Sequence, residues 1–391
     1  LGLEGEIRTG FFAHGEVRDG VLHGALRVRG EGDPTFGFRD YGDSLQALRA
    51  VAERLKALGV ERVTGDLLVD DSAFDRTLRA PDWPKAALTE RWMAGASALS
   101  LDEGVVRVSV RPGRKAGDPA AVALEPDVGY CRVTSRLVTA ARRSAVTLDH
   151  GETPGAFTAK GTVRAGAGAA IHEAAVDDPA IYFGFALRRA FAETGLAVEG
   201  RVRRPEPAEA QGGAALLTFR TPISRVLPRL LKSSQNHRAE MLFKHHGFRA
   251  SGLGTFESGG AATLAALAAA GTPVDGLVLA DGSGLSRRNR ATAAALQGAL
   301  ALTAARPEGE AFRAMLAEPG QEGTLQKRLI ELKGRLFAKT GFLDGAQSLA
   351  GYVQGVDGKW TAFAVIMNAA SGAPMRKHLD AFALALATVR A

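Results

Sequence analysis

The feature that most constrains the fold is a change in hydrophobic periodicity near residue 213. Between residues 63 and 202, apolar residues occur mostly in short runs bounded by glycine and proline, a pattern typical of β-strands. Residues 204–213 (RPEPAEAQGG) have the composition of a linker. Strongly helical segments follow at residues 222–250, 259–270 and 292–305. A strand-rich part followed by a helix-rich part predicts an α+β protein with at least two structural units.

Individual elements can be placed within this outline. Two strands separated by a polar turn predict a hairpin near the start of the chain. An amphipathic helix follows, with Asp43 or Ser44 as its cap and Gly59 as its end. The predicted elements include strands 5–12 and 21–28, helix 45–58, helix 179–194, strands 334–339, 348–353 and 361–368, and a last helix at 374–388.

The charge balance allows several anionic partners but favours none of them. The 49 basic and 42 acidic residues give a net charge of +7. A basic surface attracts nucleic acid, acidic lipid headgroups or an acidic cell-wall polymer. The arginine pairs at 142–143, 203–204 and 287–288 are scattered and lack aromatic neighbours. We therefore predict a solvated basic surface and no nucleic-acid partner.

Several chemistries can be set aside. A single cysteine, Cys131, excludes an intramolecular disulfide and a multi-cysteine zinc site. No apolar run approaches the roughly 20 residues of a membrane span. The sequence has no phosphate-binding loop and no H-E-x-x-H zinc motif. The segment 280–285 (ADGSGL) resembles a hydrolase elbow, but Asp281 stands where that motif requires glycine.

Two short motifs remain, and both suit acyl transfer to a serine. Ser234-Gln235-Asn236 lies where one predicted helix gives way to the next, and Lys339-Thr340-Gly341 ends an apolar strand. Acyl transfer needs a base, a proton route to the leaving amine and donors for the developing oxyanion. A serine hydroxyl relays a proton, an asparagine amide holds a substrate peptide group, and a lysine faces a C-terminal carboxylate. The glycine lets a substrate backbone lie against the strand edge.

The surroundings of these motifs resemble one family over nearly the whole chain. The similarity follows a fixed order and combines several short segments. It identifies the chain with the D-alanyl-D-alanine carboxypeptidase/endopeptidase family of low-molecular-mass class C penicillin-binding proteins. The matching segments are GDPT (32–35), VDDSAFD (69–75), residues 98–110, SSQNHRAEMLFK (233–244), DGSGLSRRNRAT (281–292), GTLQKRL (323–329) and AKTGFLDGAQSLAGYV (338–353).

The resemblance implies a penicillin-binding, β-lactamase-like transpeptidase domain, in which an antiparallel sheet lies between helical layers. This discontinuous domain is expected to comprise residues 1–25 and 218–391. The β-rich residues 26–217 form an inserted region that is long enough for two subdomains. In the segment 281–292, Asp281, Ser283 and Ser286 are expected to shape a capped turn, and Glu240 is expected to be a surface or ion-pair residue.

The resemblance also implies an activity. The family cleaves D-Ala–D-Ala bonds, and often cross-links, in peptidoglycan stem peptides through an acyl-serine that β-lactams trap. Ser234 and Lys339 are then the expected catalytic residues. Asn236, Thr340 and Gly341 are expected to bind substrate, together with the backbone N–H of Phe342 in an oxyanion hole. No metal or organic cofactor is implied, and the expected location is periplasmic or otherwise extracytoplasmic.

The sequence departs from the family pattern in two places. No serine is followed three positions later by lysine, so the family's Ser-x-x-Lys nucleophile motif is missing. Thr324 and Lys327 have that spacing, but they lie in the GTLQKRL segment and are expected to be structural. Because the chain starts at Leu1 and the motif precedes the first strands in the family, we expect the nucleophile and a signal peptide upstream. Phe342 stands where many relatives have a hydroxyl that binds the substrate carboxylate, which adds weight to an endopeptidase or to a weak activity without deciding between them.

Two alternatives stay open at this point. A β-lactamase or esterase of the same superfamily would use the same motifs. A catalytically inactive peptidoglycan-binding protein would lack Ser-x-x-Lys in its full reading frame. The sequence does not distinguish carboxypeptidase from endopeptidase preference, and it fixes neither the oligomeric state nor the role of the inserted region.

Overall fold

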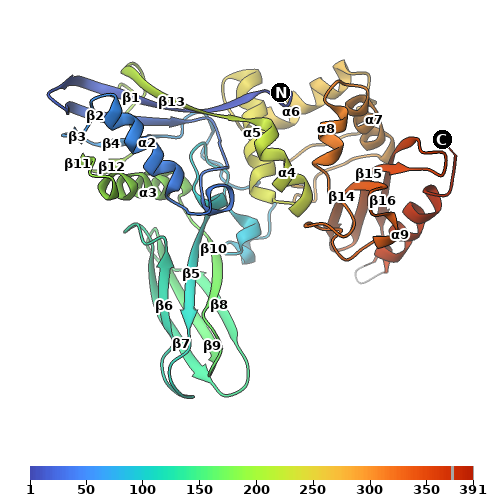
Figure 1. Ribbon diagram of the computed structural model, residues 1–391, viewed down its shortest axis with the longest axis horizontal. Coiled ribbons are helices and arrows are strands. Elements are labelled where there is room, and N and C mark those ends of the chain that lie inside the picture. The colour runs from blue at the N-terminus through green and yellow to red at the C-terminus, as the bar shows by residue number, and fades with distance from the viewer. Residues whose placement is uncertain (371–373, 391) are drawn as a thin grey trace. The chain divides into compact units, whose positions relative to one another are not determined.

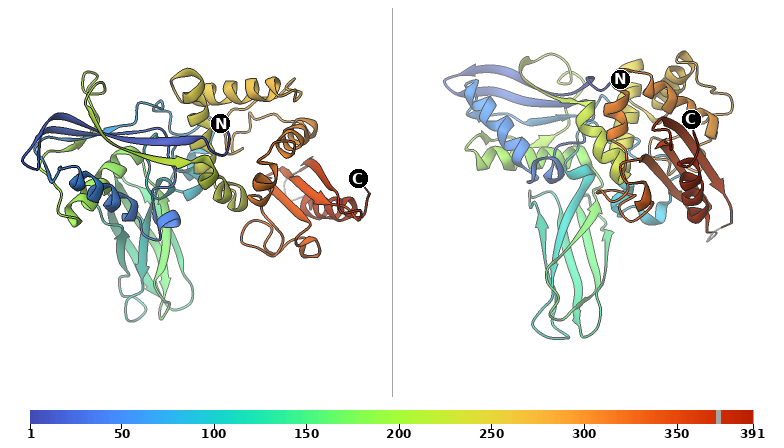
Figure 2. Two further views of the ribbon diagram at one scale, coloured as in Figure 1. Left: turned by 45° about the horizontal axis from the view of Figure 1, so that its top comes forward. Right: turned by 45° about the vertical axis from the view of Figure 1, so that its right-hand side comes forward.

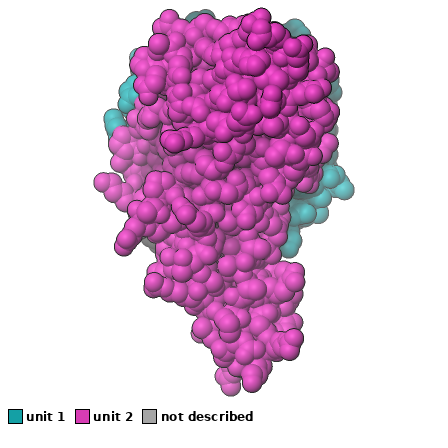
Figure 3. All heavy atoms as spheres, turned by 90° about the vertical axis from the view of Figure 1, so that its left-hand side faces the viewer, with its two compact units in different colours: residues 1–5, 222–251, 256–391 teal, residues 6–221, 252–255 magenta. Residues whose placement is uncertain are grey.

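A computed structural model describes residues 1–370 and 374–390 of the chain. It mixes helices and sheets (Figure 1) and divides into two compact units. Unit 1 comprises residues 1–5, 222–251 and 256–391, and unit 2 comprises residues 6–221 and 252–255 (Figure 3). These compact units place residues 6–25 in unit 2. The assignment of residues 1–25 and 218–391 to one family domain, with 26–217 inserted, stays a prediction.

Unit 2 is built on a seven-stranded sheet that starts with the predicted hairpin. The hairpin is longer than expected, because β1 (Glu6–Arg18) and β2 (Val21–Gly30) stay paired up to Arg18 and Val21. Asp19 and Gly20 form the turn, and both have a positive φ, of 49° and 79°. Such a two-residue turn matches the twist of the paired strands. The other strands of this sheet are β3 (Arg62–Val63), β4 (Leu67–Asp70), β11 (Ala197–Val198), β12 (Val202–Arg203) and β13 (Ala214–Pro222).

Two helices supply much of the core of unit 2. The amphipathic helix α2 (Gln46–Ala57) buries Leu48 and Leu55, as its spacing predicts. Leu58 lies just past the last helical residue and is 53% exposed. Asp178 caps α3 (Pro179–Glu193) by accepting a hydrogen bond from the backbone N–H of Ile181. The short helices of this unit are α1 (Phe38–Tyr41), η1 (Lys85–Ala87), η2 (Arg91–Met93) and η3 (Asp102–Gly104).

A lobe of two three-stranded sheets completes unit 2 and is labelled β5 to β10 in Figure 1. The sheets have the strand orders β10-β5-β6 and β7-β9-β8. Val108, Val110, Leu137 and Val163 are buried together and form a small core shared by the two sheets. The strands are β5 (Val105–Arg111), β6 (Ala121–Glu125), β7 (Arg132–Ala140), β8 (Ala145–His150), β9 (Ala156–Arg164) and β10 (Ala170–Ala175).

Unit 1 contains an antiparallel three-stranded sheet with helices on both faces (Figure 2). On one face, Leu349 and Val353 pack with Leu379 and Ala383 of α9 (Met375–Leu386). On the other face, the hydroxyl of Tyr352 donates a hydrogen bond of 2.7 Å to the carbonyl of Leu300 in α7 (Ala293–Ala304). The arrangement therefore has the expected sheet between helical layers. The strands are β14 (Leu336–Leu343), β15 (Ala346–Gln354) and β16 (Trp360–Asn368).

The remaining helices of unit 1 lie between the linker region and the sheet in sequence. Two of them, α4 (Ile223–Ser233) and α5 (Asn236–Ser251), divide the helical stretch of residues 222–250 at the Ser-x-Asn motif, as the sequence predicts. The others are α6 (Phe256–Ala269), α8 (Gly309–Ala314) and η4 (Ile330–Leu332). Within the described residues, no helix is both long and apolar enough to cross a membrane.

A buried ion pair in unit 2 provides a test of the fold. The guanidinium of Arg27 lies 2.9 Å from the carboxylate of Asp70, and both side chains are almost completely buried. Arg27 also donates hydrogen bonds to the carbonyls of Ala210 and Gly212. We expect Asp70→Ala to lower the free energy of unfolding by about 3 kcal/mol, because it leaves the buried charge of Arg27 without its counter-ion. Denaturant unfolding followed by circular dichroism measures this change.

The matched control is the exposed pair between Arg62 and Glu199, whose charged atoms lie 3.6 Å apart. Glu199→Ala should change the free energy of unfolding by less than about 1 kcal/mol, since water screens this pair. Equal effects of the two substitutions would contradict the role given to Asp70.

Candidate active site

The Ser-x-Asn motif forms the junction between α4 and α5. Ser234 follows the last residue of α4 and adopts the left-handed conformation, with φ 55° and ψ 52°. This conformation costs a residue with a side chain about 1–3 kcal/mol, and it recurs at functional sites. The side chain of Gln235 then accepts a hydrogen bond of 3.0 Å from the backbone N–H of Arg238. Both residues thus end one helix and begin the next, so the Ser234 side chain is held at a fixed corner.

The Lys-Thr-Gly motif lies within β14 and reaches the same corner. The ammonium of Lys339 donates a hydrogen bond of 2.6 Å to the hydroxyl of Ser234, which is 105 positions away in sequence. A second hydrogen bond of 2.5 Å runs from this ammonium to the carbonyl of Thr340. The two motifs found in the sequence therefore meet in the folded chain. Because the Ser234 oxygen accepts from Lys339, its own hydroxyl hydrogen can point to another acceptor.

Partial burial changes the proton affinity of Lys339. Desolvation lowers the pKa of its ammonium from 10.5 to about 8, because water stabilises the charged form better than the protein does. The group is therefore still mostly charged at neutral pH, but it gives up its proton more readily than an exposed lysine. A charged Lys339 can attract an anionic ligand. Its hydrogen bond to Ser234 also places it where it can assist a proton transfer through the Ser234 hydroxyl.

The outer edge of β14 exposes backbone donors next to Lys339. Strand β14 pairs with β15 along one edge. At its other, outer edge, the N–H of Ala338 donates a hydrogen bond to the carbonyl of Ala317. Backbone N–H groups alternate along a strand, so those of Thr340 and Phe342 point to the same outer edge as that of Ala338. The side chain of Phe342 is 71% exposed. This edge can accept an extended substrate backbone as an added strand.

Gly341 lies close to its neighbour in the sheet. It lies opposite Ser348 of β15, and a Cβ at this position would lie 2.2 Å from the Ser348 hydroxyl. Any larger residue would therefore have to displace Ser348. The structure places all six predicted site residues, Ser234, Asn236, Lys339, Thr340, Gly341 and Phe342, in unit 1, and their roles stay predictions.

A buried carboxylate supports this corner from within α5. Glu240 is completely buried and accepts hydrogen bonds of 2.8 Å from the backbone N–H groups of Gly282 and Ser283. Burial, together with the nearby charge of Asp281, raises the pKa of Glu240 to about 7. Glu240 thus ties the helix that begins with Asn236 to the loop that follows Ala280.

Asp281 organises the same loop. Its carboxylate accepts hydrogen bonds from the backbone N–H groups of Gly284 and Ser286, at 2.8 and 2.6 Å, and from the side chain of Asn289 at 2.7 Å. These bonds fold residues 281–289 into a compact turn, as expected for a capped turn. The positioning role of Glu240 was missed from the sequence. The only signal was its place four residues after Asn236, on the helix that follows the motif.

The threonine with Ser-x-x-Lys-like spacing is a packing residue. The N–H of Thr324 donates to the carbonyl of Lys232 at the end of α4, and Leu325 is fully buried. Lys327 is exposed. Thr324 therefore provides a backbone donor for the C-terminal end of α4, in agreement with its expected structural role.

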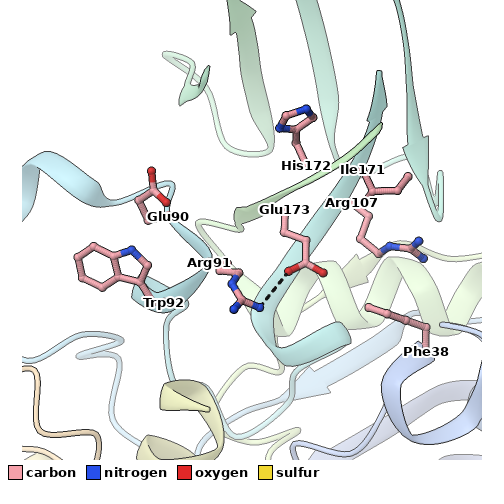
Figure 4. Close-up of a pocket in the computed structure, with 8 residues that line it drawn as sticks. All are labelled: Phe38, Glu90, Arg91, Trp92, Arg107, Ile171, His172 and Glu173. Carbon is pink, nitrogen blue, oxygen red and sulfur yellow. Dashed lines mark ion pairs between the residues drawn. The ribbon is translucent and has the colours of Figure 1, made fainter. Parts of the chain in front are cut away.

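Unit 2 contains a hollow of its own. A hollow of about 460 Å³ in unit 2 lies between η2, β5 and β10, and Figure 4 shows its ion pair between Arg91 and Glu173, at 3.5 Å. The guanidinium of Arg107 lies 4.3 Å from the ring centre of Phe38. The hollow contains none of the predicted site residues. Within residues 1–370 and 374–390, no cluster of three histidine, cysteine or acidic residues could hold a metal ion.

Comparison with known proteins identifies the family. The profile of the D-Ala-D-Ala carboxypeptidase 3 (S13) family matches residues 1–389. The chain belongs to the S13 family. A D-alanyl-D-alanine carboxypeptidase of Actinomadura sp. (strain R39) is 34% identical over 390 residues, which cover 95% of this chain and 70% of the relative. The S13 relative from Haemophilus influenzae, the D-alanyl-D-alanine carboxypeptidase DacB, is 24% identical over 93% of this chain and 76% of its own length.

The fold of the S13 chain is confirmed by a solved structure. The crystal structure of penicillin-binding protein 4 (DacB) from Haemophilus influenzae is similar, with a TM-score of 0.82 and 23% identity over 99% of this chain and 87% of that chain. A second structure of that protein, in complex with a β-lactam, has a TM-score of 0.78 and 22% identity, covering 100% of this chain and 87% of that chain. The predicted family and the predicted α+β fold class are thus confirmed.

The lowered pKa of Lys339 can be tested directly. We expect its ammonium to titrate near pH 8, so that carboxylate ligands bind more weakly as the pH rises through 8 and the positive charge is lost. NMR titration of the chain with ¹³C-methylated lysines should show a resonance that titrates there and that Lys339→Arg removes. The exposed Lys359 supplies the control, because Lys359→Arg should leave this resonance in place. A Lys339 resonance that titrates near 10.5 would refute the prediction.

The positioning role of Glu240 makes a second prediction. Glu240→Ala removes the acceptor of two buried backbone N–H groups, so we expect the unfolding free energy to fall by about 3 kcal/mol. We also expect hydrogen exchange at Gly282 and Ser283 to accelerate at least about tenfold, which is about 1.4 kcal/mol of lost protection. Exchange measured by NMR reports both amides. Glu257→Ala, on the exposed first turn of α6, is the control and should leave them unchanged. Unchanged protection in Glu240→Ala would overturn the assignment.

Proposed function

We propose that this protein is a serine-type D-alanyl-D-alanine carboxypeptidase/endopeptidase that acts on peptidoglycan stem peptides through an acyl-serine. The observation that carries the proposal is the 2.6 Å hydrogen bond between Lys339 and Ser234 beside the outer edge of β14. Membership of the S13 family and the D-alanyl-D-alanine carboxypeptidase relatives support the same activity.

The reaction uses these residues together with a nucleophilic serine that is not among them. The Ser-x-x-Lys serine of the family attacks the carbonyl carbon of the penultimate D-Ala, so a C–O bond forms and the C–N bond to the last residue breaks. The serine proton passes to a base and then to the leaving amine, which departs neutral. Ser234 can pass this proton, because its oxygen accepts from Lys339 and its hydrogen stays available. Water then hydrolyses the acyl-serine.

The remaining residues bind the substrate in this scheme. Lys339 faces the carboxylate of the substrate, Asn236 holds a peptide group, and Thr340 and Gly341 line the edge along which the peptide extends. The N–H of Phe342 points to this edge and can donate to the oxyanion. The Phe342 side chain offers no hydroxyl to a terminal carboxylate. We therefore propose that the ratio of endopeptidase to carboxypeptidase activity is higher than in relatives that have a hydroxyl at this position.

β-Lactams are the expected inhibitors, because their strained amide is attacked by the same serine and the acyl product is released slowly. A β-lactam is bound in the second crystal structure of the Haemophilus influenzae relative. The substrate is a cell-wall polymer, so we propose a periplasmic or otherwise extracytoplasmic location. The scheme requires no metal or organic cofactor.

Labelling with fluorescent penicillin tests the proposal. We expect the full-length protein to form a covalent adduct and to release D-Ala from a D-Ala-D-Ala peptide. Lys339→Ala and Ser234→Ala should each reduce the acylation rate by about 10²–10⁴-fold, the range for loss of a proton-transfer group. The rates are measured by gel fluorescence against time.

Ser233→Ala is the matched control, because Ser233 is the exposed serine next to Ser234 and lies outside the motif. It should leave labelling unchanged. Absence of any adduct would favour the inactive peptidoglycan-binding alternative. Rapid turnover of nitrocefin without release of D-Ala would favour the β-lactamase alternative.

A further inference from the structure

The lobe of unit 2 brings three loops together at one end. Residues 112–120 connect β5 to β6, residues 141–144 connect β7 to β8, and residues 165–169 follow β9. The N–H of Gly113 donates to the hydroxyl of Thr139 at 2.8 Å, and Thr139 also exchanges backbone hydrogen bonds with Gly117 and Asp118. The N–H of Ala165 donates to the carbonyl of Ala140. These bonds join the loops into one surface, which we call the lobe tip.

The lobe tip lies at the far end of the lobe from the core of unit 2. Val106, Val128, Cys131 and Phe157, at the opposite ends of the strands, belong to the main core of this unit. Only the small core around Val108 continues toward the tip. Figures 1 and 3 show that the lobe narrows to a blunt end. The tip is therefore a solvent-facing end of the lobe.

The lobe tip is strongly basic. Residues 111–119, 139–145 and 164–169 contain six basic residues and a single acidic one. All six basic residues are exposed, and none forms an ion pair within the part of the chain that the structure describes. The acidic residue, Asp118, is half-buried and accepts a hydrogen bond from the backbone N–H of Lys115. The six are Arg111, Arg114, Lys115, Arg142, Arg143 and Arg164.

Two other acidic residues of the lobe lie away from the tip, and both are paired. Glu125, at the core end of β6, lies 3.5 Å from Arg107, and Asp149, at the core end of β8, lies 2.7 Å from Lys160. The lobe is thus polarised, with unpaired positive charge at one end. This grouping could not be seen in the sequence, where Arg114-Lys115 and Arg142-Arg143 stand 27 positions apart (142 minus 115).

The other residues of the tip limit what it can bind. The loops between the charges consist of glycine, alanine, proline and serine, with no aromatic and no large apolar residue. Single-stranded nucleic acid is bound by stacking of bases on aromatic side chains in a basic groove, and the tip has no aromatic side chain. The six exposed basic residues instead stand on neighbouring loops and strand ends with small residues between them, which suits contact with a broad anionic surface.

We propose that the lobe tip is a docking surface for an anionic lipid bilayer. Basic residues near such a surface are attracted within a Debye length, about 10 Å at 0.1 M salt, and their contributions add. The lack of aromatic and large apolar residues means that the tip rests on the headgroups without insertion. Binding should therefore be reversible and strongly weakened by salt. The inference concerns unit 2 and does not depend on the proposed enzymatic function.

Sedimentation with vesicles tests the proposal. The 391-residue chain should sediment with vesicles of equal parts phosphatidylglycerol and phosphatidylcholine, and should stay in solution with vesicles of phosphatidylcholine alone. A tip variant with glutamine at positions 114, 115, 142 and 143 should bind at least about 100-fold more weakly. Lysine at positions 114, 142 and 143 keeps the charge and should keep the binding, which separates charge from folding defects.

The control variant carries glutamine at Arg18, Arg54, Arg76 and Arg249, four exposed arginines for which the described residues show no ion pair. It loses the same net charge, from +7 to +3 (7 minus 4), and should bind within a few fold of the parent. Equal losses in the two glutamine variants would show that net charge alone acts and would overturn the proposal. Binding of soluble poly(glycerol phosphate) or DNA by the tip without binding of the anionic vesicles would overturn it as well.

Discussion

The geometry of the candidate site depends on the short turn at which α4 becomes α5. Ser234 takes a left-handed backbone conformation there, and the side chain of Gln235 caps the helix that follows. A regular helix through this point would carry the Ser234 hydroxyl around the helix axis and away from β14. The break instead lets the hydroxyl meet Lys339 at 2.6 Å. The unfavourable backbone conformation thus occurs at the residue whose side chain must be held in place.

Buried carboxylates hold the helix that follows this turn to a neighbouring loop. Glu240 and the loop that contains Asp281 are joined by hydrogen bonds to backbone N–H groups, which offset the cost of burying the carboxylates. The raised pKa of Glu240 reflects that cost. On the opposite side, β14 is anchored in the core of unit 1 by Leu336 and Ala338. Two independent supports therefore meet at the contact between Lys339 and Ser234.

Unit 2 shows how the same residue type acquires different roles. Arg204 is held by Asp71 and Asp178, each at 2.7 Å, and Arg203 is held by Asp66 and Glu209. These arginines are internal links of the fold. Arg142 and Arg143 have no such partners and stand at the lobe tip. The sequence shows three similar arginine pairs, and only their surroundings in space distinguish a structural pair from an exposed one.

Local patterns in the sequence determined the helices, most strands and the identity of the two motifs. The helix at residues 46–57, the helix that begins at Pro179 and the three strands of unit 1 all lie close to where their periodicity predicts them. Hydrophobic spacing and caps act within a few residues, so they can be read directly from the chain. The position of the break between α4 and α5 was indicated by the Ser-x-Asn motif, which lies at Ser234, and not by hydrophobic periodicity.

Only the tertiary structure decided which distant residues meet. The contact between Ser234 and Lys339, the use of Glu240 as an acceptor for Gly282 and Ser283, and the meeting of three loops at the basic lobe tip all join positions that are far apart in the chain. Such contacts depend on sheet register and on the packing of separate elements. A single sequence fixes each element's own pattern, but it does not state which faces of different elements lie together.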